Sequence, residues 1–281
     1  MTAVTTSDRQ AGITSPLGRT LRDIAVITKR NVLRNVRLPQ LLLFATIQPV
    51  MFLLLFNYVF GGSIGRSPQL AQFGSYINWL VPGIIIQTAT FGASQTAVGL
   101  TEDLQAGVID RFRSLPMARS AVLAGRTISD LLRNAFVSGL MLTVGALIGF
   151  RYQTSFAQLV LAFLLAMGFA FSFSWVMAAV GLAVKDTETA QTASFIPLFP
   201  LVFASSVFVS VESLPDWLRV FADVQPVTVM VNAMRGLMLG EGALPTGTTV
   251  GGTVMAALAW IAAILLIFFP LSVRLYRRAA G

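Results

Sequence analysis

Amide and hydroxyl side chains interrupt an otherwise apolar stretch at residues 77–98, and these are the groups most able to contact a solute. They are Asn78, Gln87, Thr88, Thr90, Ser94, Gln95 and Thr96. Such side chains can hydrogen-bond a passing molecule or a neighbouring helix, but they perform no acid–base chemistry at neutral pH. Gly83, Gly92, Ala93 and Ser94 in the same stretch also suit close helix packing. A cavity lining and a packing face therefore both remain open.

Several chemistries are excluded by residues that the chain lacks. It has no cysteine and no histidine, so cysteine nucleophiles, thiolate metal sites and histidine bases are ruled out. No G-x-x-x-x-G-K-S/T loop occurs that could cradle ATP phosphates. No acidic residue stands deep in an apolar stretch, although a proton- or sodium-coupled carrier usually needs one. The sequence predicts no catalytic residue, no metal site and no cofactor bound by this chain.

Six apolar stretches are the elements that must position the polar groups. Each is long enough, as a helix, to cross about 30 Å of hydrocarbon. Hydrophobic residues make up 55% of the chain and charged residues 11%, against about 25% charged in soluble domains. We expect an all-α membrane protein whose 281 residues form a single membrane domain (1–281). The expected spans are 41–60, 77–98, 131–150, 156–184, 192–211 and 248–273.

The net charge of +8 is unevenly distributed. Basic residues gather before residue 40, between residues 111 and 126, and after residue 273. The positive-inside rule then predicts cytoplasmic N- and C-termini in a multi-pass protein of the cell (plasma or inner) membrane, and argues against nucleic acid as the partner. Residues 17–38 predict a basic amphipathic helix at the interface, which either anchors the chain to anionic lipids or docks a partner.

The loop at 101–127 predicts a short helix on the cytoplasmic side. Val108, Phe112 and Leu115 share one helical face, whereas Arg111 and Arg113 point elsewhere. Pro116 closes this helix. Such an element is shaped either to dock a partner or only to shield the ends of the spans.

The expected transport pathway combines the polar stretch with a broken helix. Pro197 and Pro200 interrupt the fifth apolar stretch, which is tolerated where neighbours satisfy the freed carbonyl groups. The pathway residues are expected to be Asn57, Asn78, Gln87, Phe91, Gln95, Phe195 and Phe199.

Residues 212–247 predict an external helical hairpin that re-enters the outer leaflet. Its helices, at 215–224 and 227–239, are too short to span a bilayer, and Pro226 separates them. We expect Arg235 to reach lipid headgroups or to pair with Asp216 or Asp223. The residues of this expected outer gate are Trp217, Phe221, Met230, Met234 and Arg235.

Two stretches resemble the permease subunits of ABC-2 type exporters, in the daunorubicin-resistance-like branch. They are EDLQAGVIDRFRSLPMARSAVLAGRTISD at 102–130 and QPVTVMVNAMRGLMLGEG at 225–242, where Gln225 replaces the usual asparagine. The resemblance extends over nearly the whole chain, and it includes the basic helix before the first span.

The resemblance implies a type V ABC exporter-like fold, with residues 107–116 as a coupling helix. It also implies a homo- or heterodimer of permeases, bound to two copies of a separate cytoplasmic ATPase that holds ATP and Mg²⁺. The polar stretch at 77–98 and the proline-interrupted stretch at 192–211 would line the interface of this dimer. The cargo would be hydrophobic or amphipathic, such as a drug, lipid or glycoconjugate, and membrane lipids would surround the dimer. The residues expected to couple to the ATPase are Glu102, Val108, Arg111, Phe112, Arg113, Leu115, Pro116, Met117 and Arg119.

Two other functions compete with this interpretation. A secondary multidrug carrier would need an intramembrane carboxylate. A membrane-embedded lipid enzyme would need a cluster of acidic residues or histidines at the interface, and the 212–247 segment offers only Glu212, Asp216, Asp223 and Glu241.

Overall fold

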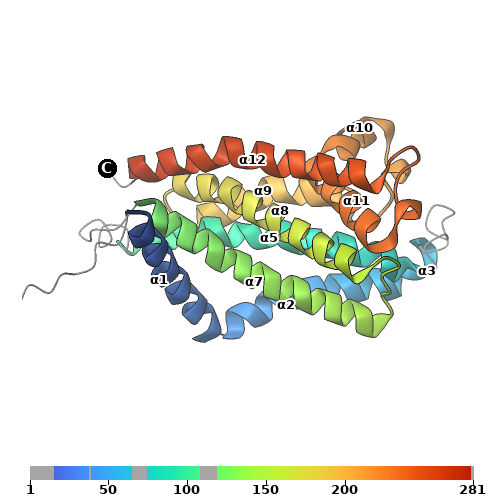
Figure 1. Cartoon of the computed structure of the whole chain (residues 1–281), viewed down its shortest axis with the longest axis horizontal. Helices are drawn as coiled ribbons and strands as arrows, with labels where there is room; N and C mark the ends of the chain where they lie inside the picture. The colour runs from blue at the N-terminus through green and yellow to red at the C-terminus, as the bar shows by residue number, and fades with distance from the viewer. Residues whose placement is uncertain (1–15, 38, 65–74, 108–118, 280–281) are drawn as a thin grey trace, which may run out of the picture.

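A computed structural model describes residues 16–37, 39–64, 75–107 and 119–279, and within these ranges the chain is a bundle of helices with no strand. Long helices run side by side along the longest axis of the molecule (Figure 1). In chain order they are α1 (Pro16–Arg37), α2 (Pro39–Leu55), α3 (Gly61–Ile64), α5 (Tyr76–Gln105), α7 (Arg119–Ile148), α8 (Phe156–Ala183), α9 (Thr187–Phe203), α10 (Asp216–Val224), α11 (Pro226–Leu239) and α12 (Val250–Ala279). A π-helical turn, Phe56–Phe60, joins α2 to α3.

Four segments of the described chain are long and apolar enough to cross a membrane. They are Leu42–Phe60, Val122–Ile148, Phe156–Ala183 and Val250–Arg278, which correspond to the first, third, fourth and sixth expected stretches. The second stretch lies in α5, whose apolar run is interrupted by amide and hydroxyl groups. The fifth lies in α9, which has only 17 residues because the helix ends at Phe203 rather than near residue 211.

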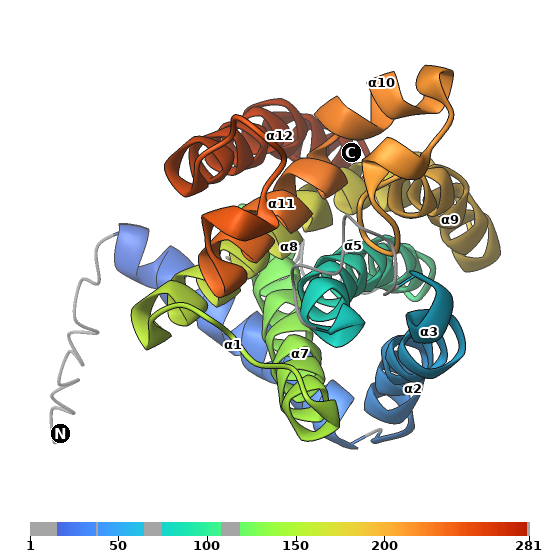
Figure 2. The same ribbon diagram turned by 90° about the vertical axis from the view of Figure 1, so that its right-hand side faces the viewer.

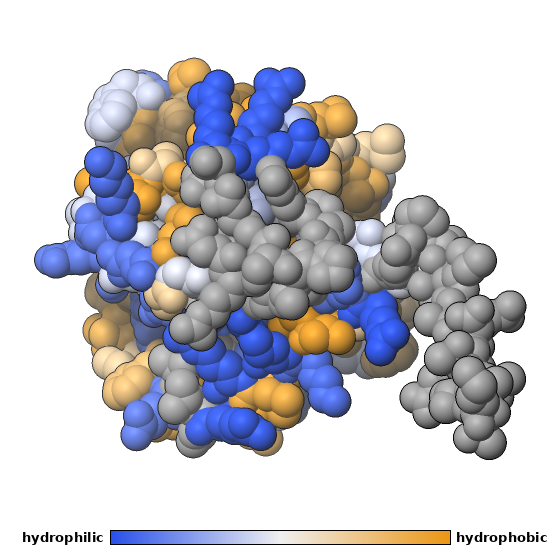
Figure 3. Space-filling model, turned by 90° about the vertical axis from the view of Figure 1, so that its left-hand side faces the viewer, coloured by the Kyte–Doolittle hydropathy of each residue, from blue (hydrophilic) through white to orange (hydrophobic). Residues whose placement is uncertain are grey.

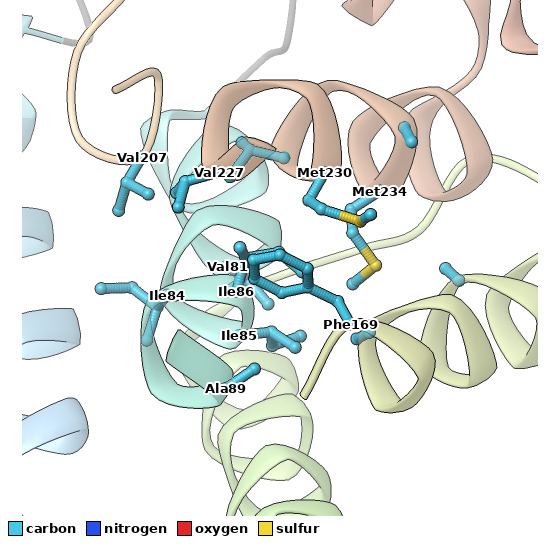
Figure 4. Packing of buried hydrophobic residues seen from close by; sticks show 14 of the residues in the cluster. Val81, Ile84, Ile85, Ile86, Ala89, Phe169, Val207, Val227, Met230 and Met234 are labelled. Carbon is cyan, nitrogen blue, oxygen red and sulfur yellow. The ribbon is translucent and has the colours of Figure 1, made fainter. Parts of the chain in front are cut away.

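The core forms around α5, which packs against α7, α8, α9 and α11. Every residue of α5 from Tyr76 to Thr90 is buried. Its apolar side chains meet Phe169 of α8 and the methionines Met230 and Met234 of α11 (Figure 4). Gly181 of α8 permits a close crossing, because a Cβ there would lie 2.5 Å from the carbonyl oxygen of Ala97. The polar helix is thus largely enclosed, and the more apolar α12 lies at the edge of the bundle (Figure 2).

The segment 212–247 forms the two expected helices, α10 and α11, at one end of the bundle (Figure 2). Its two helices differ strongly in burial. α11 packs against α5, α8 and α12, and almost all of its residues are buried. α10 leaves its apolar residues Trp217, Val220 and Val224 exposed. The segment 212–247 therefore consists of one helix inserted into the bundle, α11, and one helix on its surface, α10.

At the opposite end, α1 packs across α7 (Figure 1). Ile27 is buried against Gly125, where the two backbones approach closely enough for the Thr28 hydroxyl to donate to the Gly125 carbonyl at 3.3 Å. Hydrophilic side chains gather on this end of the molecule (Figure 3). The basic helix expected from the sequence therefore packs against the bundle through its own apolar side.

Candidate functional site

A pocket of about 90 Å³ lies between α2, α5, α7 and α9. Its wall is mainly apolar, but several polar side chains reach it. The wall includes Gln48 and Pro49 from α2, Gln87 and Phe91 from α5, Asn134 from α7 and Phe195 from α9. Four helices that are distant in sequence thus contribute to one small space inside the bundle.

Two amide groups in this wall have unused hydrogen-bonding capacity. Gln87 is 2% exposed, and its Oε1 has no hydrogen-bond partner among the described residues. The same holds for Nδ2 of Asn134. Gly92 lets Asn134 reach the wall, since a Cβ at residue 92 would clash with the Asn134 amide. One acceptor and one donor therefore face a space in which a solute could use both.

Four of the seven expected pathway residues meet here. Gln87, Phe91, Gln95 and Phe195 all line the pocket, and the rings of Phe91 and Phe195 lie 5.6 Å apart. The polar pattern of α5 thus correctly indicated residues that line a cavity between several helices. The role of these residues in transport stays a prediction.

The other three expected pathway residues lie elsewhere. Asn78 accepts a hydrogen bond from the backbone N–H of Arg151 at 2.9 Å, so it fastens α5 to the turn between α7 and α8. Asn57 is half-buried in the π-helical turn. Phe199 is 56% exposed and stacks on Phe203, with 4.3 Å between the ring centroids. None of the three lines the pocket between α2, α5, α7 and α9.

A charged network lies next to this pocket, toward the end that carries α1. Arg126 of α7 is within 3.7 Å of Asp103 and within 3.4 Å of Asp130. Arg133 is 3.6 Å from Asp130, as its i, i+3 spacing predicted, and it donates to the Gly92 carbonyl at 2.8 Å. Asp130 also accepts from the Thr96 hydroxyl at 2.7 Å. The network joins α5 to α7 through charges that compensate one another.

Most of this network was not predicted from the sequence. The i, i+4 spacing of Arg126 and Asp130 was an available signal. The sequence placed Asp130 at the edge of a span, whereas the structure places it inside the apolar segment Val122–Ile148, with 2% exposure. Both of its carboxylate oxygens have donors: two arginines and a threonine surround it.

Arg235 does not extend to the surface, and it pairs with neither Asp216 nor Asp223 nor any other acidic residue that the structure describes, so that prediction was wrong. The side chain is fully buried. Its Nε and Nη2 donate to the Trp79 carbonyl, and Nη2 also donates to the Ser206 carbonyl at 2.6 Å. Asp223 instead pairs with Arg219 on its own helix, at 3.7 Å. Arg235 lies on the inserted face of α11, and backbone carbonyls there replace the expected carboxylate.

The other expected outer-gate residues fall into two groups. Met230 and Met234 are fully buried in the core beneath α11, whereas Trp217 and Phe221 are exposed on α10. The two apolar faces expected from the sequence are both present, but only the methionines pack inside the bundle.

The expected coupling residues lie largely outside the described part of the chain. Glu102 forms an ion pair with Arg34 of α1 at 2.8 Å. Arg119 begins α7, but its side chain is not among those described. The remaining residues, which are outside the described ranges, are Val108, Arg111, Phe112, Arg113, Leu115, Pro116 and Met117.

Comparison with known proteins connects this arrangement to membrane transport. Residues 22–239 match the family model for the ABC-2 type transporter. The chain is 35% identical over 239 residues to the daunorubicin resistance ABC transporter permease protein DrrB1 of Streptomyces coeruleorubidus, which covers 85% of this chain and 80% of that protein. It is 24% identical to the probable doxorubicin resistance permease DrrC of Mycobacterium tuberculosis, over 84% of this chain and 81% of the relative. It is also 24% identical to the inner membrane transport permease YadH of Escherichia coli, over 76% and 83%.

Proposed function

Because the chain belongs to the ABC-2 type transporter family, a family of multi-pass membrane permeases, we propose that it is the membrane subunit of an ATP-driven exporter. Its cargo is a hydrophobic or amphipathic molecule. Two copies, or one copy and a related permease, bind two separate ATPase subunits in the cytoplasm. The observation that carries this proposal is the pocket between α2, α5, α7 and α9, where Oε1 of Gln87 and Nδ2 of Asn134 have no partner among the described residues, which a packing role alone does not require.

In the proposed topology all six apolar stretches cross the membrane. α5 is long enough to do so, and its polar groups are sheltered by the helices around it. α9 adds the fifth span with only 17 residues, or about 25 Å, and α11 fills the outer part of the bundle beside it. The N- and C-termini and α1 then face the cytoplasm, in agreement with the basic residues at that end.

The pocket is too small to hold a drug-sized molecule, which needs roughly 300 Å³ or more. Transport therefore requires helices to separate. Among the described helices α2 is the one best placed to move. One face contacts α5 and α7, and much of the rest is exposed. Outward movement of α2 would widen the pocket toward the lipid and expose Gln87 to a cargo that enters from the membrane.

A cysteine at Gln87 in this cysteine-free chain tests the proposal. In membranes that contain the permease and its ATPase, Gln87→Cys should react with a small maleimide at a rate that changes several-fold between ATP and ATP plus vanadate. Ser172→Cys, buried in α8 away from the pocket, is the matched control and should stay unreactive. A nucleotide-independent rate at Gln87→Cys, together with no ATPase co-purifying with the permease, would contradict the proposed function.

Phe112 provides a separate test of ATPase coupling. We propose that residues 107–116 form the coupling helix and that Phe112 is its apolar anchor. Truncating a buried aromatic anchor commonly costs about 2 kcal/mol or more. Phe112→Ala should therefore weaken ATPase co-purification and lower the stimulated ATP hydrolysis, with membrane insertion unchanged. If the variant and the wild type co-purify with the same amount of ATPase and stimulate the same rate of ATP hydrolysis, residues 107–116 are not the coupling helix.

A secondary carrier is the alternative, and Asp130 is the only buried carboxylate within the described apolar segments that could serve one. Its oxygens are already engaged by Arg126, Arg133 and Thr96. A coupling ion would have to displace these donors, so the structure favours the exporter.

A further inference from the structure

A second cavity, of about 280 Å³, lies between α1, α2, α5 and α7. It adjoins the smaller pocket, since Ala45, Gln48, Gln95 and Arg133 line both. Its wall carries more charge than that of the smaller pocket, which Arg133 alone among charged residues lines: Arg34, Arg126 and Arg133 contribute to it, together with Glu102 and Asp130. In the proposed orientation this cavity lies at the level of the inner-leaflet headgroups.

Two neutral hydrogen-bond donors in this wall have no partner. Asn31 of α1 is 5% exposed and Ser129 of α7 is 1% exposed. Nδ2 of Asn31 and Oγ of Ser129 lack a hydrogen-bond partner among the described residues. The Oδ1 atom of Asn31 is occupied by Nε and Nη2 of Arg30, at 3.4 and 3.2 Å. The amide therefore has only its donor end available to a ligand, and buried donors without partners are uncommon.

Among the described residues that line the cavity, three are arginines and two are carboxylates. Four arginines, Arg30, Arg34, Arg126 and Arg133, are paired with three carboxylates, Glu102, Asp103 and Asp130. The pairs Arg30–Asp103 and Arg126–Asp103 are long, at 3.5 and 3.7 Å. A ligand with anionic oxygens would find both the two available donors and a net positive charge in the wall here.

One side of the cavity meets the lipid-facing surface of α2. Phe44 lines the cavity and is 70% exposed, and the neighbouring Leu43 is also exposed. A ligand with a polar head in the cavity could therefore lay its hydrocarbon chains along α2. A free anion would gain nothing from this apolar rim.

We propose that the cavity between α1, α2, α5 and α7 binds the phosphate of an anionic phospholipid, with the acyl chains against α2. Asn31 and Ser129 donate to the phosphate oxygens, and the arginines compensate its charge. The assignment of this site to the inner leaflet rests on the proposed function. A lipid held there stands at the inner mouth of the smaller pocket and occupies the side on which α2 would move.

The test measures binding of short-chain lipids to the purified full chain in a non-ionic detergent by titration calorimetry. The probes are dihexanoylphosphatidylglycerol, uncharged dihexanoylglycerol and inorganic phosphate. We expect the phospholipid to bind about tenfold more tightly than either of the others, because only it carries both the charge and the chains. Inorganic phosphate binding as tightly as the phospholipid would replace the lipid site by a free-anion site.

Two variants test whether the phospholipid affinity depends on Nδ2 of Asn31 and Oγ of Ser129. Asn31→Asp keeps an oxygen for Arg30 but replaces the free donor by a negative oxygen, and it should weaken phospholipid binding at least about tenfold. Ser129→Ala removes a hydroxyl that has no partner, so it should fold normally and weaken binding about threefold. Lys29 is exposed on the same helix and does not line the cavity. Lys29→Gln therefore serves as the control, and its phospholipid affinity should stay within about twofold of the wild-type value.

The outcomes separate this proposal from the proposed function. Phospholipid affinity that is unchanged in both Asn31→Asp and Ser129→Ala overturns the headgroup site, whether or not the protein exports. ATP-dependent export of an amphipathic dye from vesicles, measured with the same preparations, tests the exporter separately. A chain that binds the phospholipid as expected but shows no ATP-dependent export would contradict only the exporter function.

Discussion

At the scale of single residues, Arg235 is the residue whose environment differs most from its expected one. Its guanidinium lies 3.2 Å from the centroid of the Trp79 ring, and it donates to backbone carbonyls of α5 and of the turn after α9. Trp79 is 156 residues away in sequence. No carboxylate forms an ion pair with Arg235 in the part of the chain that the structure describes. One side chain thus fastens the inserted helix α11 to two other segments.

Replacing Arg235 by lysine keeps the positive charge but loses the planar set of donors that reaches several carbonyls at once. We expect a loss of about 2 kcal/mol, seen as a melting temperature lower by roughly 4–8 °C in detergent. Arg219→Lys, on exposed α10, is the matched control and should shift the melting temperature by less than about 1 °C. Equal melting temperatures for Arg235→Lys and the wild type would refute a fastening role.

The residues of the pocket show which part of a site can be predicted from a sequence. Gln87, Phe91 and Gln95 share one helix, so their common face follows from helical spacing. Phe195 was expected beside them because prolines interrupt its helix. The contact of Arg126 with Asp103 could not be predicted, because Asp103 belongs to another helix. The partners of Arg235 could not be predicted either, because they are backbone carbonyls, which leave no trace in the amino-acid pattern.

At the scale of helices, the contact between α5 and α8 depends on small residues. A Cβ at Gly181 would meet the backbone of Ala97, which cannot rotate away as a side chain could. Gly181→Ala should therefore push the helices apart and destabilise the protein by about 1–3 kcal/mol. Gly139→Ala in α7 meets no atom within 4 Å and should instead be stabilising, by about 0.5–1 kcal/mol. Thermal unfolding in detergent compares the two, and a Gly181→Ala protein as stable as Gly139→Ala would contradict the close crossing.

The start of α9 should depend on pH. Asp186 caps this helix: it accepts from the backbone N–H and the hydroxyl of Thr189, both at 2.7 Å. These hydrogen bonds hold the pKa of Asp186 below its ordinary value. A carboxyl group with a lowered pKa in the folded state stabilises the fold above its ordinary pKa, and that stabilisation is lost as the pH falls.

We therefore expect amide protection in the first turn of α9, corrected for intrinsic exchange, to stay constant near neutral pH and to fall below about pH 4. Asp186→Asn provides the control, since asparagine also caps helices but does not titrate. A pH profile that is the same in the variant and the wild type would show that this carboxylate does not control the end of the helix.

The positions of several helices along the chain were predicted accurately from the sequence, but whether a helix faces lipid or protein was predicted less accurately. The boundaries of α8, α10 and α11 agree with the apolar and proline patterns to within one residue. Yet the pattern of α11 left open whether it dips into the outer leaflet or packs on top of the bundle, and the helix is buried against α5, α8 and α12. An amphipathic pattern indicates that one face meets apolar matter, but it does not distinguish lipid from protein.

At the scale of the whole molecule, the two ends of the bundle carry different kinds of segment. The ion pairs of α1 and the start of α7 lie at one end, and α10 and α11 lie at the other (Figure 1). The proposed topology places the first end in the cytoplasm. Within the described part of the chain, four helical segments satisfy the requirements for spanning by length and composition alone, and the crossing of α5 and α9 is part of the proposal.

Single cysteines test this orientation, with a membrane-impermeant maleimide applied to intact cells and to inverted vesicles. Ala106→Cys, exposed just after α5, should react only in inverted vesicles. Gly242→Cys, in the turn between α11 and α12 where a side chain meets no atom within 4 Å, should react only in intact cells. Labelling of both positions from the same side would contradict both the six-span topology and the external hairpin.

The polarity of α5 has a consequence for how the protein is made. Membrane insertion favours segments in proportion to their hydrophobicity, and amides at the centre of a helix oppose it. As it emerges from the ribosome, α5 would enter lipid poorly by itself. We expect α5 to remain next to the insertion machinery until α7 and α8 have been synthesised. Both helices follow α5 in the chain and contact it in the folded bundle, where they shield its polar groups from lipid. Nascent chains that stop before α8 should accordingly leave α5 accessible to water, and chains that include α8 should not.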